Sequence, residues 1–119
     1  MSTTINGKPI FVKKDDGLID KTRQARKYQL KLKSDKMEAI TSELDPHTES
    51  QWFKHSGEEI HLVLKGELEY TVGDKFFKLC EGDILWHDSS KPHRAKNTSD
   101  KKVKYITIGT PPTFMIDDL

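Results

Sequence analysis

The chain has 119 residues, of which 34% are hydrophobic and 33% charged, and its formal net charge is +1. This length suits one domain, which on folding would bury about two-thirds of its surface. The balanced charge gives no global field that would draw the chain to nucleic acid or to a membrane, so we expect neither as a partner. The single cysteine, Cys80, excludes an internal disulfide, and its place at a polar turn predicts a surface thiol. No apolar run approaches about 18 residues and residues 1–10 lack the pattern of a signal peptide, so we expect a cytoplasmic protein.

Short runs typical of β-strands follow one another along the chain and are separated by turn residues. The run 60–64 is apolar almost throughout, which is typical of a strand covered on both faces. Gly73-Asp74 predicts a tight hairpin turn. Many short strands with regular turn signals predict an all-β sandwich or small barrel. We expect strands over residues 10–12, 26–32, 37–44, 60–64, 68–72, 75–77, 84–86 and 103–108.

The region from Leu18 to Tyr28 is the one competitor for a helix. Because Ile19, Arg23 and Arg26 do not form an apolar stripe, we expect at most a short helical turn or two there. The lysines and arginines between residues 13 and 36 make this part of the chain mildly basic. Acidic residues interrupt the basic run and no recognition helix follows, so a solvated face is favoured over contact with nucleic acid.

Histidine and carboxylate side chains lie near the ends of the predicted strands. His55 and Glu59 are four residues apart, which is about 13 Å in one straight strand and too far to share an ion. Gly57 and the β-rich run after it argue against a helix, so we predict a turn at Ser56-Gly57 that folds His55 back over Glu59. His93 would enter from a second segment. His55, Glu59 and His93 then form a two-histidine, one-carboxylate set, which suits iron(II), manganese and related ions and which zinc also accepts.

Two blocks of the sequence carry a resemblance to a known family. In the first block six residues separate Glu59 from Gly66, and in the second Gly82 leads to His93, which is followed after three residues by Asn97. Together the blocks resemble the two motifs of the cupin superfamily, of the small single-domain (cupin 2) type. The resemblance implies a double-stranded β-helix, which is a small barrel of jelly-roll type.

The resemblance also implies an organisation and a partner. We expect one domain in three parts: N-terminal strands and a connecting segment packed on the barrel (1–34), the cupin barrel (35–114) and a C-terminal tail (115–119). The block from 57 to 97 and the ending 109–114 are similar to cupin sensor domains fused behind helix-turn-helix segments in regulators, so we expect a free-standing relative of these. Cupins commonly pair through their sheets, which makes a homodimer the expected state.

The chain departs from the cupin pattern at one usual ligand position, where Phe53 stands in place of a histidine. The proline and glycine usual in the second motif fall at Asp88 and Ser90. His61 is a candidate replacement ligand, because it shares the period-two phase of Glu59 and should point to the same face.

Several other side chains are candidates for the wall of a ligand pocket. For His61 and His87 we nevertheless favour the interpretation of an ordinary half-buried histidine. For Arg94 we favour a solvated side chain. Asn97 is expected to satisfy backbone groups in a turn, and His47 is a weaker candidate ligand. The candidates for the pocket are Phe53, His61, Tyr70, His87 and Arg94.

Three classes of function remain open. The prediction is a cupin that binds a small molecule, with a divalent metal ion (iron, manganese, nickel or zinc) held by His55, Glu59 and His93. A metal-dependent dioxygenase or isomerase would use the same ligands and would need a further acid or base. A structural or partner-binding barrel without metal is consistent with the loss of a ligand at Phe53.

Overall fold

The structure is a computed structural model that describes residues 3–4, 7–23 and 25–113. These residues contain no helix, and hence none that could cross a membrane. The predicted tail, 115–119, lies outside the described residues. The strands are β1 (Thr3–Thr4), β2 (Ile19–Arg23), β3 (Arg26–Ser34), β4 (Glu38–Leu44), β5 (Thr48–Glu49), β6 (Glu58–Lys65), β7 (Leu68–Val72), β8 (Lys75–Leu79), β9 (Ile84–Asp88), β10 (His93–Asn97) and β11 (Val103–Thr110).

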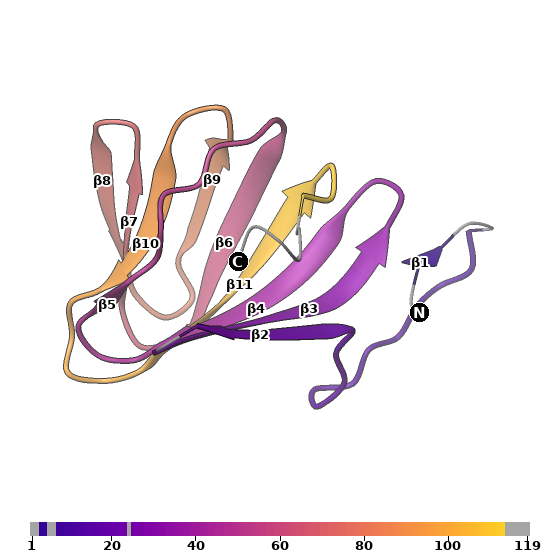
Figure 1. Ribbon diagram of the computed structural model, residues 1–119, viewed down its shortest axis with the longest axis horizontal. Coiled ribbons are helices and arrows are strands. Elements are labelled where there is room, and N and C mark those ends of the chain that lie inside the picture. Colours follow the sequence, from indigo (N-terminus) through magenta and orange to yellow (C-terminus); the bar gives the residue numbers. More distant parts are fainter. Residues whose placement is uncertain (1–2, 5–6, 24, 114–119) are drawn as a thin grey trace.

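Within the described residues these strands form two sheets that face each other (Figure 1). The larger sheet has the order β1-β3-β4-β11-β6-β9, with β2 also paired to β3, and the smaller has the order β5-β10-β7-β8. From β6 onward the chain passes back and forth between them, because β7, β8 and β10 belong to the smaller sheet and β9 and β11 to the larger. This winding is the predicted double-stranded β-helix, so the predicted all-β fold is confirmed.

The core lies between the two sheets, and in several strands it is built from alternate residues. In β7 the buried residues are Leu68, Tyr70 and Val72, and in β11 they include Val103 and Tyr105. Successive side chains of a strand point to opposite faces, so this period of two places the same set of residues inside throughout. The pattern explains why the predicted strands 26–32, 37–44, 68–72, 84–86 and 103–108 are present as β3, β4, β7, β9 and β11.

The hairpin predicted at Gly73-Asp74 is confirmed, since β7 and β8 pair with Val72 opposite Lys75. Gly73 has a φ of 60°, a left-handed conformation that a two-residue hairpin turn requires and that glycine adopts at low cost. Cys80 lies just after this hairpin and is exposed, as predicted.

Two local predictions are wrong and one strand was missed. Residues 10–12 form no strand, and Phe11 is 84% exposed. The region 18–28, where we expect at most a short helical turn or two, contains no helix, and its residues 19–23 form β2, which pairs with β3. The strand expected over 60–64 exists as β6 but is not covered on both faces, since Ile60 is 40% and Leu64 45% exposed.

Candidate metal centre

The turn before β6 brings the first two predicted ligands together. Gly57 has a φ of 98°, and a Cβ atom there would overlap the carbonyl oxygen of Thr110. Only glycine fits this close approach without strain. As predicted, the turn folds His55 back, so that its Nε2 lies 3.5 Å from Oε1 of Glu59.

The third predicted ligand comes from the smaller sheet. His93 is the first residue of β10 and is 1% exposed. Its backbone exchanges two hydrogen bonds with that of Phe53, which fixes the segment before β6 against β10. The Nε2 atom of His93 lies 3.0 Å from Oε1 of Glu59. The structure therefore brings His55, Glu59 and His93 together, and ligand atoms of the three lie within 4.8 Å of one another.

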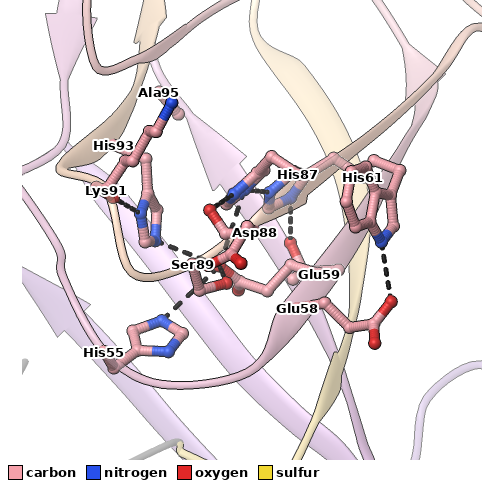
Figure 2. Close-up of polar contacts among 12 residues, drawn as sticks. His55, Glu58, Glu59, His61, His87, Asp88, Ser89, Lys91, His93 and Ala95 are labelled. Atoms are coloured by element: carbon pink, nitrogen blue, oxygen red, sulfur yellow. Dashed lines mark hydrogen bonds and ion pairs between the residues drawn. The ribbon is translucent and has the colours of Figure 1, made fainter.

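Two further histidines lie next to this group. In the pairing of β6 with β9, His87 stands opposite Glu59, and its Nε2 is 3.6 Å from Oε1 of Glu59 (Figure 2). His61 follows Glu59 by two residues in β6, so it points to the same face, as predicted. Ligand atoms of Glu59, His61 and His87 form a second group within 4.8 Å. Both histidines are almost fully buried rather than half-buried.

The histidines around Glu59 are oriented by the backbone. The Nδ1 atom faces a carbonyl oxygen in each of them, at 3.1 Å for His55, 3.0 Å for His87 and 2.8 Å for His93. A carbonyl can only accept a hydrogen bond, so Nδ1 carries the proton and, in the neutral ring, Nε2 presents a lone pair. The Nε2 atoms of all three rings therefore face Oε1 of Glu59, and a backbone carbonyl on Nδ1 is the arrangement by which proteins orient histidine ligands toward a metal ion.

The electrostatics of the site favour an ionised Glu59. Burial acts to raise the pKa of its carboxyl, but hydrogen bonds from His55 and His93 and the nearby histidine charges lower this pKa well below its usual range. The same hydrogen bond to Glu59, opposed by burial, raises the pKa of His55. Ser89 donates a further hydrogen bond of 3.0 Å to Oε1 of Glu59. The carboxylate is thus held as an anion, which is the state that a metal ion requires.

The two deeper histidines form a neutral hydrogen-bonded chain. Nδ1 of His87 is a donor, so its Nε2 accepts from Nε2–H of His61, 2.9 Å away. Nδ1 of His61 then accepts from the hydroxyl of Thr107 at 2.8 Å. Burial lowers the pKa of His61 to about 3 and also lowers that of His87. Both rings are therefore uncharged at neutral pH.

A cavity of about 510 Å³ opens in front of His55, Glu59 and His93 and is lined by residues of both sheets. Phe53 belongs to its wall, and its ring stacks on that of His93 with 6.1 Å between the centroids. Tyr70, whose pKa is raised well above its usual value by burial, also lines the cavity and contacts the His61 ring. Trp52 lies at the same wall and is about half exposed. This size and mixed lining are typical of sites for small molecules.

Other predicted residues lie away from the cavity. The guanidinium of Arg94 lies 4.5 Å from the centre of the Trp52 ring and forms an ion pair of 3.4 Å with Glu49. His47 pairs with Asp100 at the surface. Asn97 is fully buried and serves the backbone, as predicted: its amide donates to three backbone carbonyl oxygens at 2.7–3.2 Å.

Two residues of the site were missed by the sequence reasoning. Ser89 binds Glu59 from the loop after β9, where it stands between two other polar residues and carries no signal of its own. Glu38 is only 2% exposed and lines the cavity from β4. The period-two pattern could have found Glu38, because it shares the phase of Ser42 and Leu44, which are also buried.

Comparisons with known proteins agree with this fold. Residues 40–109, more than half of the chain, match the family model "Cupin domain". The chain is 36% identical to the HTH-type transcriptional regulator PuuR of Escherichia coli (strain K12) over 67 residues. These residues are 56% of this chain and 36% of that protein. It is 35% identical to H2HPP isomerase of Bacillus subtilis over 72 residues. These residues are 60% of this chain and 30% of that protein. The alignment thus spans only about a third of the length of either relative.

One solved structure covers nearly the whole chain. KdgF from Halomonas sp. superposes with a TM-score of 0.78, covering 94% of this chain and 100% of that one, at 16% sequence identity. At this identity the likeness shows the fold alone. It extends beyond residues 40–109, so the strands that precede this stretch are largely shared too.

Proposed function

Because the chain belongs to the cupin family, we propose that it binds a small molecule in the barrel cavity through a divalent metal ion held by His55, Glu59 and His93. The observation that carries the proposal is the convergence of the Nε2 atoms of His55 and His93 on one carboxylate oxygen, with each Nδ1 held by a backbone carbonyl. A metal ion would take the place of the protons through which these Nε2 atoms contact Glu59 at 3.0–3.5 Å. Iron, manganese, nickel and zinc all suit two histidines and a carboxylate.

The remaining parts of the site suit a binder. When bound, the ion would supply a Lewis-acidic position for an oxygen or nitrogen atom of the ligand. Phe53 and Trp52 would contact apolar parts of the ligand, and the buried Glu38 would favour a donor group on it. The similarity to a transcriptional regulator supports a sensing role for such a cavity.

An enzyme is the second candidate, as a metal-dependent isomerase or dioxygenase. Its support is the similarity to H2HPP isomerase and the position of His61 and Tyr70 beside Glu59. General acid–base catalysis works best with a pKa near the operating pH. In the metal-free protein, burial lowers the pKa of His61 to about 3 and raises that of Tyr70 well above its usual value. Binding is the simpler assignment, because it needs no proton-exchanging group besides the ligands.

The test is elemental analysis of protein purified without a metal-affinity tag, followed by calorimetric titration with Mn²⁺, Ni²⁺ and Zn²⁺. We expect close to one ion per chain in the wild type and a sharp loss in Glu59→Gln and His93→Ala. His47→Ala is the matched control, because it removes a histidine that pairs with Asp100 at the surface. Equal metal content in all four proteins would contradict the ligand assignment, and a wild type that refuses added metal would favour the metal-free barrel.

The outer face of the larger sheet supports the expected homodimer. Trp86 and Ile84 of β9 are 57% and 65% exposed and stand opposite Ile60 and Leu62 of β6. Ile60 and Leu64 are exposed on the same face. Contiguous exposed apolar side chains of this kind mark interaction sites. We propose that a second copy of the chain covers this face, since a two-fold pair would bury the same patch on both partners.

Light scattering coupled to gel filtration tests this proposal. The wild type should have the mass of two chains, and Trp86→Lys should have the mass of one. Phe76→Lys is the matched control, because Phe76 is an equally exposed aromatic residue on β8 of the smaller sheet. A wild type with the mass of one chain, or a dimer that survives Trp86→Lys, would exclude this face as the interface.

A further inference from the structure

We propose that His87 is a fourth ligand of the metal ion and takes the role of the histidine that Phe53 replaces. The inference rests on the proposed function, because it concerns the same ion. It concerns a residue of β9, whereas the position occupied by Phe53 lies in the segment before β6.

The pairing of β6 with β9 places His87 for this role. His87 stands directly opposite Glu59 in the antiparallel pair, so both side chains point into the barrel. Three Nε2 atoms lie near the same oxygen, Oε1 of Glu59, at 3.0 Å for His93, 3.5 Å for His55 and 3.6 Å for His87 (Figure 2). The rings of His87 and His93 are neighbours, with 4.6 Å between their centroids.

The orientation of His87 matches that of the other two histidines. Its Nδ1 donates to the carbonyl oxygen of Asp88 at 3.0 Å, so that Nε2 is left as the ligand atom. Phe53 offers no ligand atom and instead stacks on the ring of His93. The chain therefore retains three histidine Nε2 atoms within 3.6 Å of one carboxylate oxygen, although His87 comes from β9 and not from the segment before β6.

His61 competes for the ligand atom of His87. The Nε2 lone pair of His87 accepts a hydrogen bond from His61 at 2.9 Å, and one lone pair cannot bind both a proton donor and a metal ion. Metal binding must therefore displace this hydrogen bond. Removing the donor should strengthen metal binding, whereas removing His87 should weaken it.

Matched leucine substitutions at the two buried histidines separate their roles. We expect His87→Leu to weaken the calorimetric affinity for Co²⁺ by at least about 10-fold, given that even outer-shell changes cost about 10–100-fold. We expect His61→Leu to strengthen it by about 5-fold, the effect of freeing one ordinary hydrogen bond. Pulsed EPR of the Cu²⁺-loaded proteins should count three histidine nitrogens in the wild type and in His61→Leu, but two in His87→Leu.

Each outcome bears on a different claim. A wild type that binds metal through two histidines, with unchanged affinity in His87→Leu, would overturn this inference and leave the proposed function standing. Loss of one nitrogen in His61→Leu would also overturn it and would assign the ion to the deeper group of Glu59, His61 and His87. A wild type that binds neither Co²⁺ nor Cu²⁺ would overturn both. If His87→Leu fails to fold, as judged by its thermal transition, the nitrogen counts of the other two proteins still decide.

Discussion

The buried His61 should make the stability of the metal-free protein fall on acidification. Burial lowers the pKa of His61 from its ordinary value of 6.5 to about 3. Below pH 6.5 the unfolded chain takes up a proton at this residue, while the folded protein keeps it neutral down to about pH 3. The unfolded state is therefore favoured as the pH falls through this window.

The magnitude follows from the same two values. One proton bound only by the unfolded chain changes the free energy of unfolding by about 1.4 kcal/mol per pH unit, once that proton is fully taken up. Between pH 6.5 and 4.5 His61 should therefore cost the folded state about 2 kcal/mol. Small domains are stable by about 5–15 kcal/mol, so a change of this size is measurable.

Urea unfolding of wild type and His61→Leu at pH 6.5, 5.5 and 4.5, in the presence of a chelator, checks this prediction. Other groups of the site also titrate: the lowered pKa of His87 acts in the same direction as His61, and the raised pKa of His55 acts in the opposite direction. The stabilising effect of the low pKa of Glu59 is lost only below its ordinary value of 4.5. The difference between the two proteins therefore isolates His61. If the variant loses as much stability as the wild type between pH 6.5 and 4.5, the reasoning is refuted.

Four further substitutions test the local structure and the site. Asn97→Ala should lower the free energy of unfolding by about 3 kcal/mol in a denaturant titration, because one buried and two partly buried hydrogen bonds to backbone carbonyl groups are lost. Gly57→Ala should cost at least about 2 kcal/mol by the same measurement, since it adds a clash with a backbone carbonyl to the cost of a left-handed φ. Gly82→Ala is its control: φ is 86° and the space around a Cβ is open, so about 1 kcal/mol is expected, and equal costs at both positions would contradict the clash. Phe53→His should tighten metal binding in a calorimetric titration, and an unchanged affinity would show that this position does not reach the ion.

The hydrophobic pattern predicted most strands of the larger sheet but missed β10 of the smaller sheet. The buried residues of β10 are His93, Ala95 and Asn97, so the strand alternates correctly while two of its three inward side chains are polar. A pattern based on apolar residues cannot detect such a strand. The polar residues face inward because His93 contacts Glu59 and Asn97 serves the backbone. The failure therefore falls on the strand that carries His93, one of the three predicted ligands.

The candidate site was predictable only in part, because some of its contacts depend on how the strands pair. The motif spacing brought His55, Glu59 and His93 together, and the period of two placed His61 on the inner face. The contact of His87 with Glu59 depends on the register between β6 and β9, which nothing local to either strand specifies. The missed strand β2 shows the same dependence, because it is defined by its pairing with the edge of β3.

The two faces of β6 link the proposed site to the proposed interface. Glu59 and His61 point inward, while Ile60, between them, points outward and is 40% exposed. Across the strand pair, His87 faces the site and its neighbour Trp86 faces outward, where its indole donates to Glu58 at 2.7 Å. A slip of one residue would exchange the two faces, placing the apolar side chains around the carboxylate position and the metal ligands in solvent. The register that brings His87 to Glu59 is therefore the register that gathers the outer apolar patch, and a partner covering that patch would hold β9 in the position that the fourth ligand requires.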